Sequence, residues 1–241
     1  MDLTLTVLGC DGSFPGPGGA GSGFLVRGGG AVVWLDCGPG TFANLQRHVG
    51  IGDVDAIVVT HEHPDHRTDL EGFAVASEYF LERTAFPVHA PAGVFANGYH
   101  TDPPAFAHEL IGDGDRWKVG GLSFTASRTD HGPMTLAVRI EADGRSLVYS
   151  ADTGVDWSLD RLGEPADLAL VEASYTASDE ADRFKHLSGR QAGAMARAGG
   201  ARRLVLTHFW PTADREAIRA EAEETYGAPV ELAEIGATFI V

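Results

Sequence analysis

The segment from Thr60 to His66 carries four side chains that can bind a metal ion: His61, His63, Asp65 and His66. Imidazole nitrogens and carboxylate oxygens suit zinc, manganese or iron. A solvated polar turn is the alternative interpretation, but four such groups within six residues are hard to obtain by chance. The segment therefore predicts a metal site.

The neighbouring residues limit how these side chains can point. Pro64 would break a helix, which excludes the arrangement in which two histidines one helical turn apart bind zinc. Residues 54–60 form an apolar run that predicts a buried strand. We therefore expect an extended turn after this strand. In such a turn the first two histidines point the same way, and Asp65 and His66 lie on the neighbouring side.

Apolar runs predict the strands that must position these ligands. They cover residues 3–8, 23–27, 31–36, 54–60, 122–126, 135–140, 146–150, 168–172, 204–207 and 237–241, with a further short strand near residue 88. Helices are expected over 41–49, 68–83, 188–199 and 213–226, and capping boxes at Thr68–Glu71 and Ser188–Gln191 mark two of their starts. Strands of the first half follow one another without strict alternation with helices. This pattern predicts stacked sheets with helices outside them, in one domain over residues 1–241.

A glycine-rich segment imitates a nucleotide-binding motif. Gly16 to Gly21 matches G-x-G-x-x-G, and Asp36 lies twenty residues beyond Gly16. That motif needs a helix directly after the glycines, because the helix N-terminus holds the pyrophosphate. Here the glycines lead into the strand-like run 23–27 instead. We therefore expect a mobile loop near the site, with no dinucleotide cofactor.

Composition narrows the classes of protein and partner. The chain has 241 residues, 44% of them hydrophobic, which suits one large globular domain. Its net charge of −16 disfavours binding to nucleic acids or anionic membranes. No apolar run approaches the roughly 18 residues of a membrane span. The first residues lack a signal-peptide pattern, and the two cysteines make no disulfide framework. We expect a cytoplasmic protein.

The metal-binding segment resembles the T-H-x-H-x-D-H signature of the metallo-β-lactamase superfamily. The likeness covers nearly the whole chain, because the later ligands of that family have counterparts in order. These are His131 after a strand, Asp152 in the segment 149–154, and His208 after the last inner strand. Ala151 stands where a glycine is usual. The resemblance implies an α/β fold, the four-layer αββα sandwich of that superfamily.

The resemblance also implies two divalent metal ions. Zinc is the favoured metal, and manganese or iron are the alternatives. The first ion would be bound by His61, His63 and His131, the second by Asp65, His66 and His208, and Asp152 would bridge them. Two ions about 3.5–4 Å apart can hold a bridging hydroxide that attacks the substrate. Asp65 could also orient this nucleophile. The oxygen-reducing diiron branch has a carboxylate at the position of His63, so hydrolysis is favoured over redox chemistry.

Two further residues resemble catalytic positions of the tRNase Z-like branch. Glu172 lies in a segment similar to its H-E-A-T motif, with Val171 in place of the histidine, and His186 is similar to the histidine of its H-S-T motif. We expect His186 to donate a proton to the leaving group and Glu172 to hold His186. The structural alternatives are a surface histidine beside a helix cap and a buried, paired carboxylate.

The chain departs from tRNA-processing enzymes of that branch, which carry a long basic arm between the third histidine and the bridging aspartate. Only twenty residues separate His131 from Asp152, enough for a hairpin. The chain is more similar to small bacterial members regarded as atypical cyclic-nucleotide phosphodiesterases. We therefore expect a binuclear metal-dependent hydrolase of small phosphodiesters. Cyclic nucleotides are candidate substrates.

Other functions stay open at this point. One is a different ester hydrolase of the same fold, acting on a lactone, a thioester or a cyclic phosphonate-derived ester. Another is a tRNA 3′-processing endonuclease without the arm, and a third is a metal-stabilised binding module without turnover. The expected partner is a small-molecule phosphodiester, not a membrane or a nucleic-acid polymer. A homodimer is left open, and the stretch 102–108 could be a lid or a dimer contact.

Overall fold

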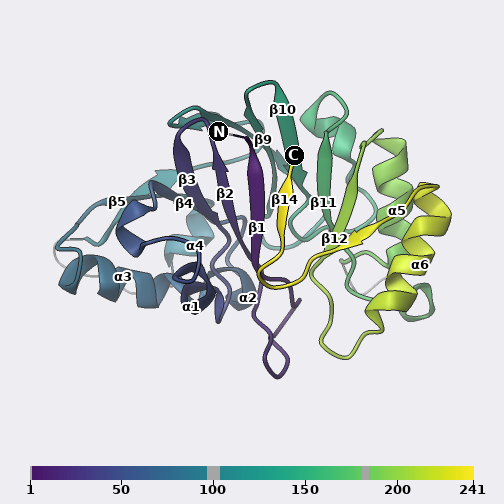
Figure 1. Cartoon of the computed structure of the whole chain (residues 1–241), viewed down its shortest axis with the longest axis horizontal. Helices are drawn as coiled ribbons and strands as arrows, with labels where there is room; N and C mark the ends of the chain where they lie inside the picture. The colour runs from purple at the N-terminus through teal and green to yellow at the C-terminus, as the bar shows by residue number, and fades with distance from the viewer. Residues whose placement is uncertain (1, 97–103, 181–184) are drawn as a thin grey trace.

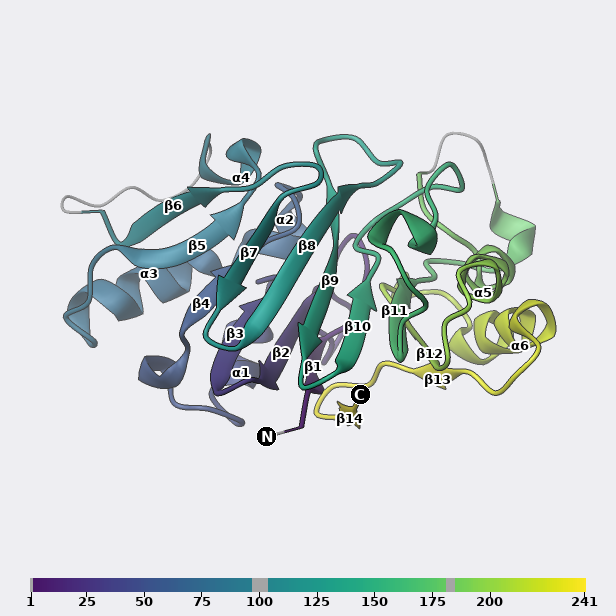
Figure 2. The same ribbon diagram turned by 90° about the horizontal axis from the view of Figure 1, so that it is seen from above.

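The computed structural model describes residues 2–96, 104–180 and 185–241, which form two seven-stranded β-sheets packed face to face (Figures 1 and 2). The first sheet has the order β14 (Thr238–Ile240), β1 (Thr4–Gly9), β2 (Gly23–Gly28), β3 (Ala31–Leu35), β4 (Ala56–Val58), β5 (Phe86–Ala90) and β6 (Phe106–Leu110). The second has the order β13 (Glu231–Leu232), β12 (Leu204–Thr207), β11 (Leu168–Glu172), β10 (Arg145–Tyr149), β9 (Leu136–Ala142), β8 (Leu122–Arg128) and β7 (Arg116–Val119).

Helices cover the outer faces of both sheets. They are α1 (Thr41–Leu45), α2 (Pro64–Arg67), α3 (Leu70–Tyr79), α4 (Ala92–Ala96), α5 (Gly189–Ala198) and α6 (Arg215–Tyr226), with short 3-10 turns at Ile51–Asp53, Leu159–Leu162 and Ala177–Asp179. In Figure 1, α1 and α3 lie on the side of the first sheet, and α5 and α6 on the side of the second. The predicted four-layer αββα sandwich is therefore confirmed.

Three apolar clusters hold these layers together. Between the sheets, Phe24 of β2 meets Tyr149 of β10 edge-on, with ring centroids 5.2 Å apart. Behind the first sheet, Trp34 packs against Phe73 of α3 at 5.9 Å. Behind the second sheet, the apolar face of α5 and α6 covers β11 and β12. Burial of one large apolar side chain contributes about 1.5–3 kcal/mol, so each interface is strongly favoured.

Strand direction brings many chain segments to one edge of each sheet. In the first sheet β1, β3, β4, β5 and β6 run the same way, because β2 is antiparallel to both of its neighbours and the others pair in parallel. In the second sheet β8, β10, β11, β12 and β13 share a direction for the same reason. Residues that follow these strands therefore gather at one edge.

Several local predictions agree with the structure. Asp143 and Gly144 both have positive φ, 50° and 75°, between β9 and β10, as a type I′ hairpin turn requires. The predicted capping box at the start of α5 is present, since Ser188 Oγ accepts the Gln191 N–H and the Gln191 side chain accepts the Ser188 N–H. Gly227, with φ of 82°, ends α6 as predicted.

The prediction around Pro64 and Thr68 was wrong in two respects. Pro64 does not prevent a helix: it is the first residue of α2, where its missing N–H costs no hydrogen bond. Thr68 does not begin a capping box, because its hydroxyl donates to the Pro64 carbonyl and so closes α2. Asp69 is the residue before α3, and its carboxylate accepts the Phe42 N–H at 2.7 Å instead of capping the helix.

The stretch 102–108, suspected to be a lid, ends in a strand. Residues 106–108 belong to β6, which pairs in parallel with β5 at the edge of the first sheet. Asp102 and Pro103 lie outside the described residues. β7, β13 and α4 were not predicted either. Among the described residues, the helices include none long and apolar enough to cross a membrane.

Candidate metal centre

All seven predicted metal ligands come from segments that follow strands of shared direction within each sheet. His61 and His63 lie just after β4, and His131 lies shortly after β8. Asp152 follows β10, and His208 follows β12 directly. Asp65 and His66 belong to the short helix α2 that continues from the first histidines. The structure brings these seven side chains together where the edges of the two sheets meet.

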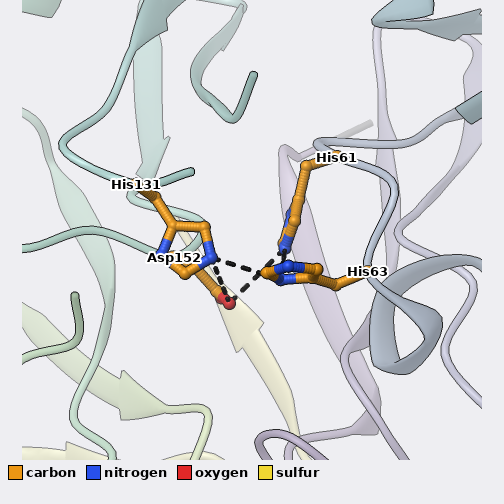
Figure 3. Close-up of side chains that lie close together, drawn as sticks. All are labelled: His61, His63, His131 and Asp152. Atoms are coloured by element: carbon orange, nitrogen blue, oxygen red, sulfur yellow. Dashed lines mark hydrogen bonds and ion pairs between the residues drawn. The ribbon is translucent and has the colours of Figure 1, made fainter. Parts of the chain in front are cut away.

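The first four ligands form a compact cluster (Figure 3). His63 Nδ1 lies 3.0 Å from His61 Nε2 and 3.2 Å from His131 Nε2. Asp152 Oδ2 lies 3.5 Å from His61 Nε2 and 3.8 Å from His131 Nε2. A tetrahedral zinc site with bonds of about 2.0–2.1 Å has ligand atoms about 3.3 Å apart. These four atoms are therefore spaced as ligands of one ion.

A second cluster lies on the other side of Asp152. Asp65 Oδ2 lies 3.6 Å from His66 Nε2 and 3.3 Å from His208 Nε2. The second oxygen of the bridging residue, Asp152 Oδ1, lies 3.1 Å from His66 Nε2 and 3.2 Å from His208 Nε2. The carboxylate of Asp152 thus faces the first cluster with one oxygen and the second cluster with the other.

Unpartnered buried atoms indicate that the donor set fits metal ions. His66 Nε2 and Asp152 Oδ1 are fully buried and form no hydrogen bond, although they lie 3.1 Å apart. Buried polar atoms without a partner are rare in folded proteins because they lose their hydration. A divalent cation between them would satisfy both lone pairs. The residues present therefore suit the ions that the sequence predicts.

Hydrogen bonds to the outer ring nitrogens fix the orientation of the buried histidines. His66 Nδ1 donates to Asp36 Oδ2 at 2.8 Å, which leaves its Nε2 free to bind metal. The hydroxyl of Thr60 donates to the same carboxylate oxygen at 3.0 Å and accepts from His61 Nδ1 at 3.1 Å. Tyr149 also donates to Asp36 Oδ2, at 3.0 Å. Asp36 thus supports ligands of both clusters.

The imidazole rings of His131 and His208 are held in the same way. His131 Nδ1 donates to the Lys185 carbonyl at 2.9 Å, and His208 Nδ1 donates to Ser174 Oγ at 3.0 Å. Ser174 in turn donates to Glu172 Oε2 at 3.0 Å. Asp36, Ser174 and Tyr149 are site residues that the sequence did not predict. A buried aspartate directly after a strand, in Leu35–Gly38, was the available signal for Asp36.

The loop between β1 and β2, residues 10–22, contains the glycine-rich segment and is part of the centre; we call it the glycine-rich loop. The Ser13 N–H donates to Asp65 Oδ2 at 2.7 Å, and the Gly12 N–H donates to the carbonyl of Phe209, the residue after His208. A Cβ atom at Gly12 would lie 2.5 Å from His208 Nδ1. The absence of a side chain at Gly12 therefore lets the loop pack directly against a predicted ligand.

The second predicted pair also lies at this edge. His186 Nδ1 donates to Glu172 at 3.1 Å to Oε1 and 3.2 Å to Oε2, and its ring centroid lies 5.1 Å from that of His208. Glu172 is fully buried and also accepts the N–H groups of Thr153 (2.6 Å) and Leu187 (3.2 Å). His186 Nε2 is the ring nitrogen that remains for a substrate or a metal.

Charges at the centre favour the metal-binding protonation states of Asp65, Asp152 and His61, whereas at His66 the surrounding carboxylates outweigh burial and raise the pKa well above its usual range. Burial raises the pKa of Asp65, but His66 and His208 outweigh it and hold that pKa below its usual range. The pKa of Asp152 is likewise held well below its usual range by His208, His66 and His61 against the effect of burial. Burial and the neighbouring His66 lower the pKa of His61 to about 4. An ionised carboxylate and a neutral imidazole are metal-binding forms.

The pKa of His186 is shifted upward, in the opposite direction to that of His61. Burial lowers the pKa of His186, but the charge and hydrogen bond of Glu172 outweigh it and raise the pKa to about 9. The carboxylate stabilises the protonated imidazolium because it lies in direct contact with it. This arrangement supplies a proton at the margin of the two clusters.

Comparison with known proteins agrees with this arrangement. A family profile described as "Beta-lactamase superfamily domain" matches residues 32–209. An uncharacterized protein of Mycobacterium leprae is 33% identical, over 99% of this chain and 89% of its own length. A protein named ribonuclease Z from Mycobacterium bovis is 29% identical, over 95% of each chain.

One relative has also been solved as a crystal structure. The probable metallo-hydrolase YhfI of Bacillus subtilis is 28% identical, over 97% of this chain and 98% of its own. Its crystal structure superimposes with a TM-score of 0.90 over 99% of each chain. The family match covers the residues of both clusters but does not include the glycine-rich loop. This chain therefore belongs to the β-lactamase superfamily and is a hydrolase of the metallo-β-lactamase fold.

Proposed function

We propose that this protein is a phosphodiesterase that binds two divalent metal ions, with zinc as the favoured metal, and cleaves small phosphodiesters. The observation that carries the proposal is the carboxylate of Asp152, whose two oxygens lie 3.5 Å from His61 Nε2 on one side and 3.2 Å from His208 Nε2 on the other. One carboxylate shared between two complete ligand sets supports a binuclear centre. When bound, such a pair of ions supplies a water activated at neutral pH and positive charge for an in-line displacement.

The protein side chains supply the remaining tasks. Asp65 is positioned by the Ser13 N–H and can hold and orient the attacking water through its carboxylate. His186 is fixed through Nδ1 by Glu172, so Nε2 can donate a proton to the departing alkoxide oxygen. An alkoxide is a poor leaving group without such a proton, which is why a positioned acid favours this assignment.

The connection between His131 and Asp152 supports a small substrate. It consists of β9, β10 and their two-residue turn at Asp143–Gly144, without an arm that could hold a folded RNA. The net charge of −16 also opposes RNA, because basic side chains supply most of the binding energy for phosphate backbones. The name ribonuclease Z of one relative makes precursor tRNA the substrate to test against.

A substrate panel tests the proposal. Zinc- and manganese-loaded protein is assayed on bis(p-nitrophenyl) phosphate, 3′,5′-cyclic nucleotides, a lactone, a thioester and precursor tRNA, with metal content measured by elemental analysis. We expect two ions per chain and turnover of the phosphodiesters. Turnover of only the lactone or thioester would point to a different ester hydrolase, and metal-loaded protein inert on every ester would point to a binding module. Tight, salt-sensitive binding of precursor tRNA, followed by its cleavage, would also refute the proposal.

A further inference from the structure

Phe14 carries a large, exposed aromatic side chain on the loop whose residues Gly12 and Ser13 contact the metal centre. It is 58% exposed, and its neighbours Ser13 and Pro15 are exposed too, whereas residues 9–12 just before them are all buried. Phenylalanine is costly to expose, and an aromatic ring on a loop beside a pocket is a common means of binding a flat ligand. Its place on a loop that contacts the metal centre makes Phe14 a candidate for contact with the substrate, unlike other exposed aromatic rings such as Phe80.

The backbone beside Phe14 is fastened to the second cluster. Ser13 has a φ of 64°, and the Phe14 N–H donates to the Gly12 carbonyl at 2.8 Å, which closes a three-residue turn around Ser13. A turn of this hand is rare and strained for a residue with a side chain. Strain of this kind persists where the surrounding structure enforces it, often at binding sites.

Contacts at Gly12 and Ser13 enforce the turn. The Ser13 N–H donates to Asp65 Oδ2, and Gly12 packs against the imidazole of His208. Adjacent Cα atoms are about 3.8 Å apart, and Phe14 is one residue from the contact to Asp65 and two residues from the contact to His208. A group bound at the second cluster is therefore within reach of the Phe14 ring.

The loops after His131 and Asp152 carry exposed side chains of a different kind. Met134 (40% exposed) and Val155 (58% exposed) lie on the loops after His131 and Asp152, which are joined because the Asp130 carbonyl accepts the Gly154 N–H at 2.7 Å. Both side chains are aliphatic and offer no ring face for stacking. A flat substituent of the substrate would therefore stack on the side of Phe14, and a smaller apolar group would suit the side of Met134.

We infer that Phe14 is a specificity-determining residue that stacks on a flat aromatic ring, such as a nucleobase, carried by one substituent of the phosphodiester. This inference rests on the proposed phosphodiesterase function and narrows its substrate class. The centre alone would accept any small diester, and Phe14 selects those with a ring next to the phosphate. A tyrosine at this position would retain the stacking face.

Two esters with the same leaving group test the inference: thymidine 5′-(p-nitrophenyl phosphate) and methyl p-nitrophenyl phosphate. Both release p-nitrophenolate, so they differ only in the substituent that stays on the phosphate. We expect the wild type to prefer the thymidine ester. Phe14→Ala should lower kcat/KM on that ester about 5- to 150-fold, the factor expected for one lost base–aromatic stack, mainly through KM. The methyl ester should be unaffected, and Phe14→Tyr should restore the preference.

Controls separate this role from a structural one. Phe80→Ala removes an aromatic ring that is 78% exposed just beyond the end of α3 and should change neither ester. Metal content of Phe14→Ala should stay at the wild-type value. Equal losses on both esters, or lost metal, would overturn the inference. A wild type that cleaves both esters equally, with no effect of Phe14→Ala, would overturn it but leave the phosphodiesterase proposal intact. A wild type that cleaves neither ester would overturn both.

Discussion

Replacement of Asp36 by asparagine should weaken metal binding without removing a ligand. The carboxylate of Asp36 accepts four hydrogen bonds in the core: from the Thr60 N–H (2.8 Å) to Oδ1, and from the Thr60 hydroxyl (3.0 Å), His66 Nδ1 (2.8 Å) and the Tyr149 hydroxyl (3.0 Å) to Oδ2. Asparagine has the same shape but only one acceptor oxygen. Its NH₂ group must face at least one of these donors.

The size of the effect follows from the geometry. The amide oxygen is best placed at the Oδ2 position, where it keeps three donors, so the Thr60 N–H loses its partner. A buried unsatisfied donor costs about 1–3 kcal/mol of folding free energy. His66 also loses a charged partner that raises its basicity, and loss of such a partner typically lowers metal affinity about 10- to 100-fold. We expect this loss at the second cluster, which contains His66, and a smaller loss at the first.

Competition with a chromophoric chelator measures the two affinities, and thermal unfolding of metal-free protein measures the stability. Asp167→Asn is the matched control. Asp167 also accepts several hydrogen bonds, from Ser146, Arg145 and Arg202, but it precedes β11 at the opposite edge of the sheet. That variant should lose stability and keep both affinities. Unchanged affinities in a folded Asp36→Asn protein would refute the argument that Asp36 orients the ligands.

Three further outcomes are expected. Asp152→Ala should reduce the metal content from two ions per chain to one or none, because only this carboxylate faces both clusters, and full occupancy by elemental analysis would contradict the binuclear assignment. His186→Ala should keep both metals yet lose about 10²- to 10⁴-fold in kcat on diesters with alkoxide leaving groups, and far less on p-nitrophenyl esters. Equal losses on the two kinds of ester would instead mean that His186 positions the substrate. Gly12→Ala should weaken metal binding at the second cluster, since its Cβ would meet the His208 ring at 2.5 Å. Gly52→Ala, whose Cβ would make an ordinary contact with Leu81 at 3.5 Å, should leave metal affinity unchanged.

Local patterns predicted the elements whose residues interact mainly with chain neighbours. The hairpin at Asp143–Gly144 and the capping box at Ser188 depend on residues two or three positions apart, so the sequence contains all the partners. At Thr68 the same kind of reasoning was wrong, because two local partners compete for one hydroxyl and the Pro64 carbonyl is preferred. β6 was missed since its alternation is weak and its pairing with β5, about twenty residues away, decides its structure.

The sequence by itself also determined the kinds of ligand atoms and their order along the chain. Three histidines and an aspartate within six residues after an apolar strand require a metal or an unusual polar turn, and the later ligands follow strands of their own. What the sequence could not determine is which atom of each side chain faces which neighbour.

Tertiary structure alone decided which ligand atoms face each other. It placed Asp152 between two clusters, and it brought Tyr149 to Asp36 across 113 positions of the chain. It also turned the glycine-rich loop into a support for Asp65. These contacts join residues far apart in sequence, and their geometry depends on how two sheets pack against each other. Spacing along one chain carries no record of that packing, because side-chain orientation in the core is set by the combined contacts of several strands.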